Sequence, residues 1–383
     1  MTNGNLDNFD PLDKDDIKEI EYAKEIIISS IKKTSLDLSG LTILTEAASG
    51  HWRFTPFIAL FSNATKVICI SKNSKYGTVS SIKENFNKIC KYFKFDNRIE
   101  IVENIDFINF ENIDIVTNSG HVRPIDKKFV SKMNKTSVIS LMWEPWEFRE
   151  SDIDLSECWK KGIPVLGVNE NNAFLNIMNY NGDLMLELFK KLNLKFSNKN
   201  IIFVIENKTV FPILQSLKSI NLNVFCISES MHDTLIEHGH NVIGNNINDL
   251  QVEPYLKKSD IIIVNSFPSS KIILGTKECS LIKKLNPKIS VLVYFGIVDY
   301  EKLKEYQINY YPKSSPISNH MSWTIEMLGP KPIIELSTIG LKVTETPSKC
   351  KKMGMSINDI DKQMLKNPFY LSFSGKQKKK YFK

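Results

Sequence analysis

Short apolar runs alternate with helical stretches along the first half of this chain, and this alternation constrains the fold more than any other feature of the sequence. Six runs read as buried strands: Leu41–Thr45, Lys66–Ile70, Ile99–Val102, Asp114–Thr117, Ser137–Leu141 and Pro164–Gly167. Helical stretches precede and separate them, at Asp16–Lys33, Pro56–Ser62, Val79–Tyr92, Asp126–Met133 and Leu155–Lys161. The pattern predicts a parallel sheet covered on both faces, in which ligands bind beyond the carboxyl ends of the strands.

A second alternating unit follows a long helical stretch at Asn171–Leu192. Its expected strands are Asn200–Ile205, Asn223–Ile227, Asn241–Ile243, Asp260–Val264 and Lys288–Tyr294. A polar stretch then ends this unit, and the apolar segment Met321–Thr346 indicates that the chain returns to the first domain. We therefore predict an α/β protein with two Rossmann-like domains, each a doubly wound parallel sheet, and an inter-domain cleft. The expected domains are residues 1–172 with 320–383, and residues 173–319, with residues 374–383 as a basic disordered tail.

Composition excludes several classes of protein. No apolar run reaches the length of a membrane span, and the first sixteen residues are polar and acidic, unlike a signal peptide. The six cysteines are scattered without the spacing of a metal site, and they read as buried thiols in a reducing compartment. We expect a cytoplasmic protein that has two domains, each with its own hydrophobic core, and that has no membrane partner.

The net charge of +7 does not by itself indicate which partners the protein binds. Five lysines fall within the last eight residues, and the rest of the chain is close to neutral. A basic tail alone does not make a nucleic-acid-binding surface, so we expect no nucleic-acid partner. A small-molecule substrate is the expected ligand instead.

Arginine is rare here, and three of the four arginines follow expected strands, at Arg53, Arg123 and Arg149. The planar guanidinium grips a carboxylate or phosphate in a way that lysine does not reproduce. Each of the first two arginines lies on a polar turn, and we take both turns as substrate-binding candidates. For the turn that carries Arg53, a capping loop with surface charges is the alternative. The candidate residues of the two turns are Glu46, Gly50, His51 and Arg53, and Ser119, Gly120, His121 and Arg123.

The third arginine ends a run that contains two tryptophans, two glutamates and a proline, Trp143 to Arg149. Aromatic rings beside carboxylates are typical of walls that hold a polar or cationic small molecule, and equally of a packed domain interface. We assign Trp143, Trp146 and Arg149 to substrate binding and Glu144 to a candidate catalytic role. The histidines at 232, 238 and 240 lack the carboxylates or cysteines that would support a metal site, and we expect no metal.

The order of motifs between about residues 114 and 324 resembles the D-2-hydroxyacid dehydrogenase family, of the formate and glycerate dehydrogenase type. The matching segments are Asp114 to Val122, Ile153-Asp154-Leu155 with Gly162-Ile163-Pro164-Val165, Ser259-Asp260-Ile261-Ile262, Leu285-Asn286-Pro287, and His320-Met321-Ser322-Trp323-Thr324. Adenosylhomocysteine hydrolases are a more distant resemblance. The family resemblance implies a homodimer, NAD or NADP as cofactor, and His320 as the catalytic acid–base group, with Asp299 or Glu301 as its carboxylate partner.

Two departures from that family concern the cofactor and the substrate. The first cofactor turn should be rich in glycine, because only glycine lets the backbone approach a pyrophosphate, yet here it begins Glu206-Asn207-Lys208. Glu229 remains as a candidate ribose ligand, and Glu206, Asn207 and Ser266 complete the expected cofactor-binding set. The family's substrate arginine after the last cofactor strand is also missing, because no arginine follows Arg149.

Three functions stay open at the level of the sequence. The first is an NAD(P)-dependent oxidoreductase that acts on a small anionic metabolite. The second is an enzyme of another reaction type that binds a nucleotide such as S-adenosylmethionine, since Leu41–Ile70 also suits a methyltransferase, although Ser71-Lys72-Asn73 stands where an acidic residue would contact the ribose. The third is a ligand-binding protein without activity, because a fold alone does not carry a function.

Overall fold

The computed structural model describes residues 12–196, 198–207, 209–266, 271–313 and 321–383. The chain divides into two compact units, Met1–Ile177 with Gly329–Lys383, and Met178–Leu328. We call them the first and the second unit. Both boundaries lie a few residues beyond those expected from the sequence, and the division into a discontinuous and a continuous unit is the expected one.

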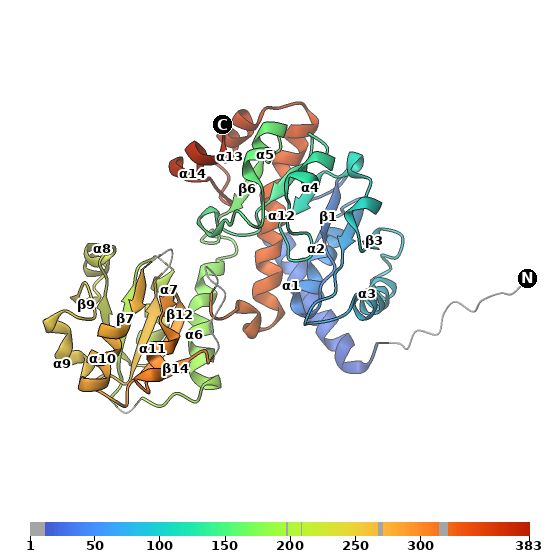
Figure 1. The fold of residues 1–383 in the computed structure, drawn as a ribbon. Helices are drawn as coiled ribbons and strands as arrows, with labels where there is room; N and C mark the ends of the chain where they lie inside the picture. The colour runs from blue at the N-terminus through green and yellow to red at the C-terminus, as the bar shows by residue number, and fades with distance from the viewer. Residues whose placement is uncertain (1–11, 197, 208, 267–270, 314–320) are drawn as a thin grey trace, which may run out of the picture. The chain divides into compact units, whose positions relative to one another are not determined.

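A seven-stranded sheet forms the centre of the first unit (Figure 1). In spatial order the strands are β15 (Tyr370–Leu371), β6 (Val165–Val168), β5 (Val138–Ser140), β4 (Ile115–Thr117), β1 (Thr42–Glu46), β2 (Lys66–Ile70) and β3 (Ile99–Val102). All are parallel except the short edge strand β15, which pairs antiparallel to β6. The chain runs outward from β1 to β3 and then crosses to β4, so the order of strands reverses between β1 and β4. Ligands of doubly wound sheets bind at this kind of switch point.

Helices cover both faces of this sheet. They are α1 (Lys14–Thr34), α2 (Thr55–Phe61), α3 (Val79–Phe93), α4 (Lys127–Lys132), α5 (Leu155–Lys161), α12 (Pro330–Lys352), α13 (Ile357–Met364) and α14 (Gly375–Tyr381). On one face, Phe129 of α4 and Cys158 of α5 share a hydrophobic core with strand residues such as Val116. On the other face α12 packs on β4, β5 and β6 and against α1 and α2. The central helix α12 is buried along most of its length.

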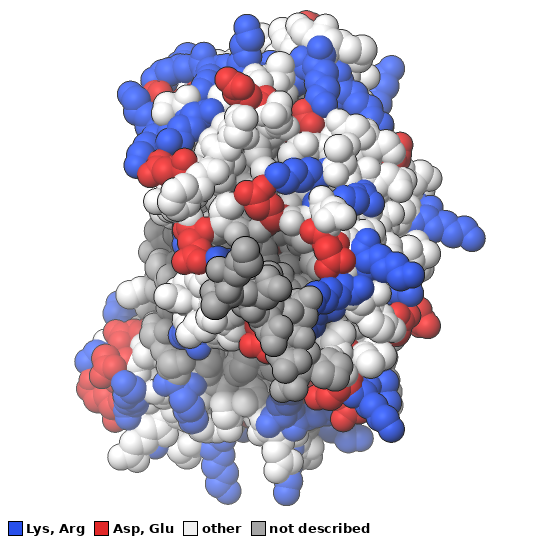
Figure 2. All heavy atoms as spheres, turned by 90° about the vertical axis from the view of Figure 1, so that its right-hand side faces the viewer, with Lys and Arg blue, Asp and Glu red and all other residues white. Residues whose placement is uncertain are grey.

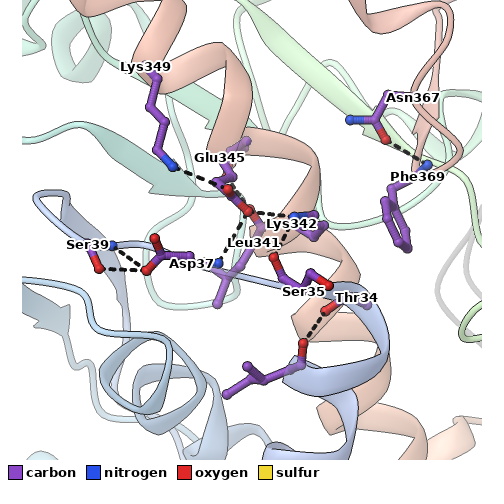
Figure 3. Close-up of polar contacts among 12 residues, drawn as sticks. Thr34, Ser35, Asp37, Ser39, Leu341, Lys342, Glu345, Lys349, Asn367 and Phe369 are labelled. Carbon is purple, nitrogen blue, oxygen red and sulfur yellow. Dashed lines mark hydrogen bonds and ion pairs between the residues drawn. The ribbon is translucent and has the colours of Figure 1, made fainter.

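Polar contacts fix α12 to the segment that follows α1 (Figure 3). Lys342 donates to Ser35 O at 2.8 Å and pairs with Glu345 at 2.7 Å. The carboxylate of Glu345 also accepts a hydrogen bond from the backbone N–H of Asp37 at 3.3 Å. These contacts join residues about 300 positions apart, and so they hold the returning end of the chain in the first unit.

Two glycines allow close approaches that position the loops at the sheet's carboxyl edge. A Cβ on Gly340 of α12 would lie 2.7 Å from Met142 Sδ, and Ser140 donates to Gly340 O at 2.7 Å. A Cβ on Gly167 of β6 would overlap Cγ of Pro145. Real Cβ atoms do not tolerate such approaches, so these glycines let α12 and the loop after β5 pack against the strands.

The last residues were expected to form a disordered tail, and this expectation is wrong. Gly375–Tyr381 form α14, whose first turn is capped by Ser374 and Gln377. Beyond it, the ring of Phe382 stacks on Trp159 with 4.7 Å between centroids, and Gln377 donates to Pro145 O at 2.7 Å. The lysines suggested disorder, but the aromatic residues between them give the segment an apolar surface to bury.

The second unit contains a six-stranded parallel sheet. Its strands, in spatial order, are β14 (Asn309–Tyr311), β12 (Ser290–Phe295), β10 (Ile261–Asn265), β7 (Asn200–Ile205), β8 (Asn223–Ile227) and β9 (Asn241–Gly244). Here the order reverses between β7 and β10. A two-stranded ladder of β11 (Ile272–Leu274) and β13 (Ile297–Val298) accompanies the sheet.

Helices α6 (Tyr180–Lys191), α7 (Val210–Ser219), α8 (His232–Glu237), α9 (Glu253–Leu256), α10 (Thr276–Leu285) and α11 (Tyr300–Glu305) complete the second unit. The first of them begins at Tyr180, later than the expected Asn171, because the Asn172 side chain accepts hydrogen bonds from the N–H groups of Phe174 and Leu175. Such a local turn competes with helix formation. The α/β class with two Rossmann-like sheets is therefore confirmed.

On the face drawn in Figure 2, the described Lys and Arg side chains are interspersed with Asp and Glu. Among the described residues, no helix is both long and apolar enough to span a membrane.

Candidate functional site

The switch point of the first sheet carries the buried carboxyl group of Glu46, the last residue of β1. The backbone N–H of His121, in the turn after β4, donates to Glu46 Oε2 at 2.9 Å. Gly120 permits this approach, since a Cβ there would lie 3.2 Å from the same oxygen. Burial raises the pKa of Glu46, while the hydrogen bond from His121 and the charges of His121 and Arg123 oppose the rise. The structure thus brings together Glu46, Gly120 and His121 from the two turns that the sequence singled out.

The neighbouring strand β2 adds Lys72 to this edge of the sheet. Its ammonium group donates to Arg123 O at 2.7 Å, and its backbone N–H lies 3.3 Å from His121 Nδ1. Partial burial lowers the pKa of Lys72, and the nearby charge of Glu46 opposes the change. Sequence reasoning missed this lysine as a site residue. Its position at the end of an expected strand was the available signal.

Arg123 and Arg149, which the sequence analysis assigned to substrate binding, converge on one carboxylate of the chain itself. Both guanidinium groups pair with Asp152 Oδ2, at 3.3 Å and 3.5 Å. The ring of Trp143 lies beside both, 4.3 Å from the Arg123 Cζ and 5.9 Å from the Arg149 Cζ. Arg123 also donates to Asn118 O at 3.0 Å. Two guanidinium groups therefore share a single aspartate on one wall of this edge.

Three glutamates gather beside these arginines, on the loops after β5 and β6. Trp146 Nε1 donates to Glu144 Oε2 at 2.5 Å, and the backbone N–H of Glu170 lies 3.3 Å from Glu144 Oε1. Burial and the charge of Glu144 raise the pKa of Glu147 to about 7, against the opposing charge of Arg149. Burial and the charges of Glu147 and Glu144 raise the pKa of Glu170 well above its usual range. We call Glu144, Glu147 and Glu170 the glutamate cluster.

The sequence pointed to only one member of the glutamate cluster, Glu144. Glu147 belonged to the same run but had no role assigned, and Glu170 follows β6, which the sequence did not place beside β5. Burial also raises the pKa of Glu144. Strongly perturbed carboxyl groups that gather at strand ends mark a candidate functional site.

Several buried polar atoms at this edge have no hydrogen-bond partner among the described residues. They include Asn118 Oδ1 after β4, Ser71 Oγ after β2 and Trp143 Nε1 after β5. The whole side chains of Asn118 and Ser71 are inaccessible, and Asn118 Nδ2 donates to Leu141 O at 3.3 Å. A buried acceptor without a partner costs free energy, and such groups in native proteins call for an explanation such as a ligand or a water molecule. The backbone of Met142 adds to the local strain, with a φ of 71°.

The other arginine turn is engaged elsewhere. Arg53 pairs with Glu19 of α1 at 2.9 Å and donates to Asn85 of α3 at 3.4 Å, and His51 Nδ1 lies 3.5 Å from Glu19. Gly50 begins the short 3-10 helix that carries these side chains. The described contacts of Arg53 therefore tie two helices together and do not join it to Arg123 and Arg149.

A pocket of about 310 Å³ opens beside Asp152. Its carboxyl groups are already engaged: Asp126 and Asp154 cap α4 and α5, and Glu150 binds Lys380 and Tyr381. Asp152 itself holds the two arginines. These local contacts explain why acidic residues line the pocket. We therefore do not assign the substrate to it.

At the switch point of the second sheet, the turn after β7 is satisfied by its own side chains. Asn207 Oδ1 accepts from the backbone N–H of Thr209 at 3.0 Å, and Asn265 Nδ2 donates to Thr209 Oγ1 at 3.2 Å. Ser266, after β10, is inaccessible, and its hydroxyl has no partner among the described residues. Asn207 and Ser266 thus lie at the ends of the neighbouring strands β7 and β10.

Glu206 and Glu229 follow the neighbouring strands β7 and β8 of the second sheet. The carboxylate of Glu206 accepts from the backbone N–H groups of Glu229 and Ser230, both at 3.3 Å, and from Ser230 Oγ at 2.5 Å. Glu229 itself pairs with Lys271 at 3.5 Å. The carboxylate of Glu206 therefore fills a position at which backbone donors would otherwise meet an anion.

Of the expected catalytic residues Asp299 and His320, the structure describes Asp299. Asp299 caps α11, where its carboxylate accepts from the N–H of Lys302 at 3.0 Å. This contact gives Asp299 a structural role. His320 lies outside the described residues. Within the described chain, no group of three or more His, Cys, Asp or Glu side chains is arranged to hold a metal.

Among known proteins, only solved structures match this chain. No family model and no curated protein matches the chain. The crystal structure of a dipicolinate synthase subunit from Bacillus halodurans has a TM-score of 0.53 at 9% sequence identity, and the match covers 80% of this chain and 99% of that one. This likeness shows the fold alone: the chain shares the fold of that synthase subunit.

Two dehydrogenase structures also match, at lower scores. A putative D-3-phosphoglycerate dehydrogenase from Ralstonia solanacearum has a TM-score of 0.47 and 11% identity, over 82% of this chain and 95% of that one. D-lactate dehydrogenase from Escherichia coli has a TM-score of 0.49 and 12% identity, over 83% and 98%. Both scores lie below 0.5 and add nothing to the fold assignment.

Proposed function

We propose that this protein is an NAD(P)-dependent oxidoreductase that acts on a small anionic metabolite. The observation that carries the proposal is the convergence of Arg123 and Arg149 on one carboxylate at the carboxyl edge of the first sheet. Two partly buried guanidinium groups held side by side favour an anionic ligand. The dipicolinate synthase of similar fold is named for a small dicarboxylate, which agrees with a ligand of this kind.

In this proposal the second unit binds the nucleotide at the ends of β7 and β10, where the order of its strands reverses. The turn after β7 has no glycine, and Glu206 already occupies the N–H groups of residues 229 and 230. A pyrophosphate placed in the ordinary way would meet this carboxylate at close range. The nucleotide therefore binds in a different pose, or the Glu206 side chain moves away from the pyrophosphate when the nucleotide binds.

The acid–base group in this proposal is His320, which the family resemblance assigns to catalysis. A cytoplasmic location and a homodimer also remain proposals, and light scattering of the purified full chain tests the second of them. The adenosylmethionine alternative gains no support. Ser71 and Lys72 follow β2, where a methyltransferase would use a carboxylate to hold the ribose, and none of the three similar structures is described as a methyltransferase.

A fluorescence titration with NADH and with NADPH tests the proposed function. We expect saturable binding of at least one of them to the wild-type protein. The Glu206→Ser variant should bind about tenfold more tightly, because it removes a negative charge and frees two N–H donors for a phosphate.

Glu237→Ser is the matched control, because Glu237 is an exposed acidic residue on α8 of the same unit. This control should leave the affinity for both nucleotides unchanged. If neither nucleotide binds the wild-type protein, the oxidoreductase assignment fails, and the non-catalytic alternative becomes the better account.

A further inference from the structure

The segment that contains α14, residues 372–383, contacts the loop after β5 in the first unit. We call it the α14 segment. Gln377 Nε2 donates to Pro145 O at 2.7 Å, and Tyr381 Oη donates to Glu150 Oε1 at 2.5 Å. Polar contacts therefore reach the loop in two places, from a segment that lies about 230 positions away along the chain.

Aromatic rings join the same two parts of the chain. The centroid of the Phe148 ring lies 5.3 Å from that of Tyr381 and 6.1 Å from that of Phe373. Phe373 is buried in the hydrophobic core of the first unit, and Phe382 stacks on Trp159 of α5 with 4.7 Å between centroids. Apolar contacts thus anchor the α14 segment to the core and place the loop against it.

The loop after β5 has little regular structure of its own. Its one regular element is the short 3-10 helix Pro145–Glu147. In the part of the chain that the structure describes, hydrogen bonds between backbone groups of residues 145–150 lead only to residues 144–152. Helix α14 has seven residues, too few to be stable in isolation. The loop and the α14 segment therefore depend on the contacts between them.

Arg149 lies between Phe148 and Glu150, two loop residues that the α14 segment contacts. Its guanidinium pairs with Asp152 at 3.5 Å, and its Cζ lies 5.9 Å from the centre of the Trp143 ring. The first distance is longer than a direct charged hydrogen bond, and the second is near the limit of a cation–π contact. A small displacement of the loop would break both contacts.

We propose that the α14 segment positions Arg149 in the anion-binding site, with Gln377 and Tyr381 as the positioning residues. When the segment detaches, the loop moves and Arg149 leaves its place beside Asp152. The site then loses one of its two guanidinium groups, so binding of a small anion depends on attachment of the segment. That this anion is the substrate rests on the proposed function.

Modification of the full chain with phenylglyoxal, an arginine-directed reagent, tests this inference without any ligand. The chain has four arginines, so peptide mapping by mass spectrometry gives a separate rate for each of them. In the variant Gln377→Ala with Tyr381→Ala, we expect Arg149 to react about tenfold faster than in the wild type. The reason is that two hydrogen bonds and a ring contact that hold the loop in place are lost.

Two other arginines serve as internal references. Arg53 pairs with Glu19 at 2.9 Å and Arg123 donates to Asn118 O at 3.0 Å, both outside the loop after β5, so both should keep their rates. Lys379→Ala is the matched control, because Lys379 is an exposed residue of α14. This control should leave the rates of all four arginines unchanged.

An unchanged rate at Arg149 in the double variant overturns the inference. If all four arginines react faster, the double variant has lost its fold, and the single variant Gln377→Ala decides. In that variant, a faster reaction confined to Arg149 supports the inference, whereas no increase at Arg149, or an equal increase at Arg53, overturns it.

Failure of this inference is distinguishable from failure of the proposed function, because the reagent requires neither a nucleotide nor a metabolite. Binding of NADH together with an unchanged rate at Arg149 leaves the oxidoreductase proposal intact and removes this inference. A faster reaction at Arg149 in a protein that binds neither NADH nor NADPH does the reverse.

Discussion

Replacement of Asp152 by alanine is expected to lower the free energy of unfolding of the first unit by about 3 kcal/mol. Asp152 is the shared partner of Arg123 and Arg149, and the side chains of both arginines are only 21% exposed. Without it, two partly buried guanidinium groups face each other with no carboxylate between them. Burial and the charge of Arg149 already lower the pKa of Arg123, and Asp152 is the first of the groups that oppose this.

Urea denaturation followed by circular dichroism at pH 7 measures the effect of Asp152→Ala, provided that the slope of the transition is unchanged. Removing Arg149 as well should restore part of the loss, because the remaining guanidinium no longer faces a like charge. Glu157→Ala is the control, and we expect it to change the midpoint little because both of its lysine partners are mostly exposed to solvent. Equal midpoints for Asp152→Ala and this control would contradict the structural account of the arginine pair.

Replacement of Glu147 by glutamine is expected to stabilise the protein at pH 8, by up to about 3 kcal/mol, and to have little effect at pH 4.5. The folded protein raises the pKa of Glu147 to about 7, so the folded state holds this proton more tightly than the unfolded chain does. The wild-type protein therefore loses stability as the pH rises from about 4.5 to about 7. Glutamine cannot ionise, and the variant escapes this loss.

Denaturation midpoints of the wild type and the Glu147→Gln variant at the two pH values test this expectation. Glu150→Gln should show the opposite sign, because hydrogen bonds from Lys380 and Tyr381 lower the pKa of Glu150 and its ionised form stabilises the fold. A difference between Glu147→Gln and wild type that is the same at pH 4.5 and pH 8 would show that the glutamate cluster does not hold a proton.

Much of the fold was predictable because buried strands of a parallel sheet are continuous apolar runs. The six strands of the first alternating unit were expected within one residue of their observed ends. One edge strand of each sheet was missed: β15 has two residues and β14 has three, too short to give a periodic pattern. The helix α14 was missed because its lysines dominated the composition, whereas its aromatic contacts depend on the position of Trp159 in the fold.

The candidate site was predictable to a smaller extent. Strand ends identified Glu46, His121, Arg123 and Arg149, because residues after parallel strands share one edge of the sheet. Arg53 followed the same rule and yet contacts Glu19 of α1, a partner that the local sequence does not reveal. The glutamate cluster depends on β6 lying beside β5, and strand order is a property of the whole chain rather than of any one loop.

The central claim is that the loops after β4 and β5 in the first unit bind the small-molecule ligand. Hydrogen–deuterium exchange of the full chain, with and without the small anionic 2-hydroxy acids malate and 2-hydroxyglutarate at saturating concentration, tests it most directly. We predict slower exchange in residues 118–123 and 142–149 and unchanged exchange in residues 50–54. Protection confined to residues 50–54, or no change in residues 118–123 and 142–149 at saturation, would contradict the claim.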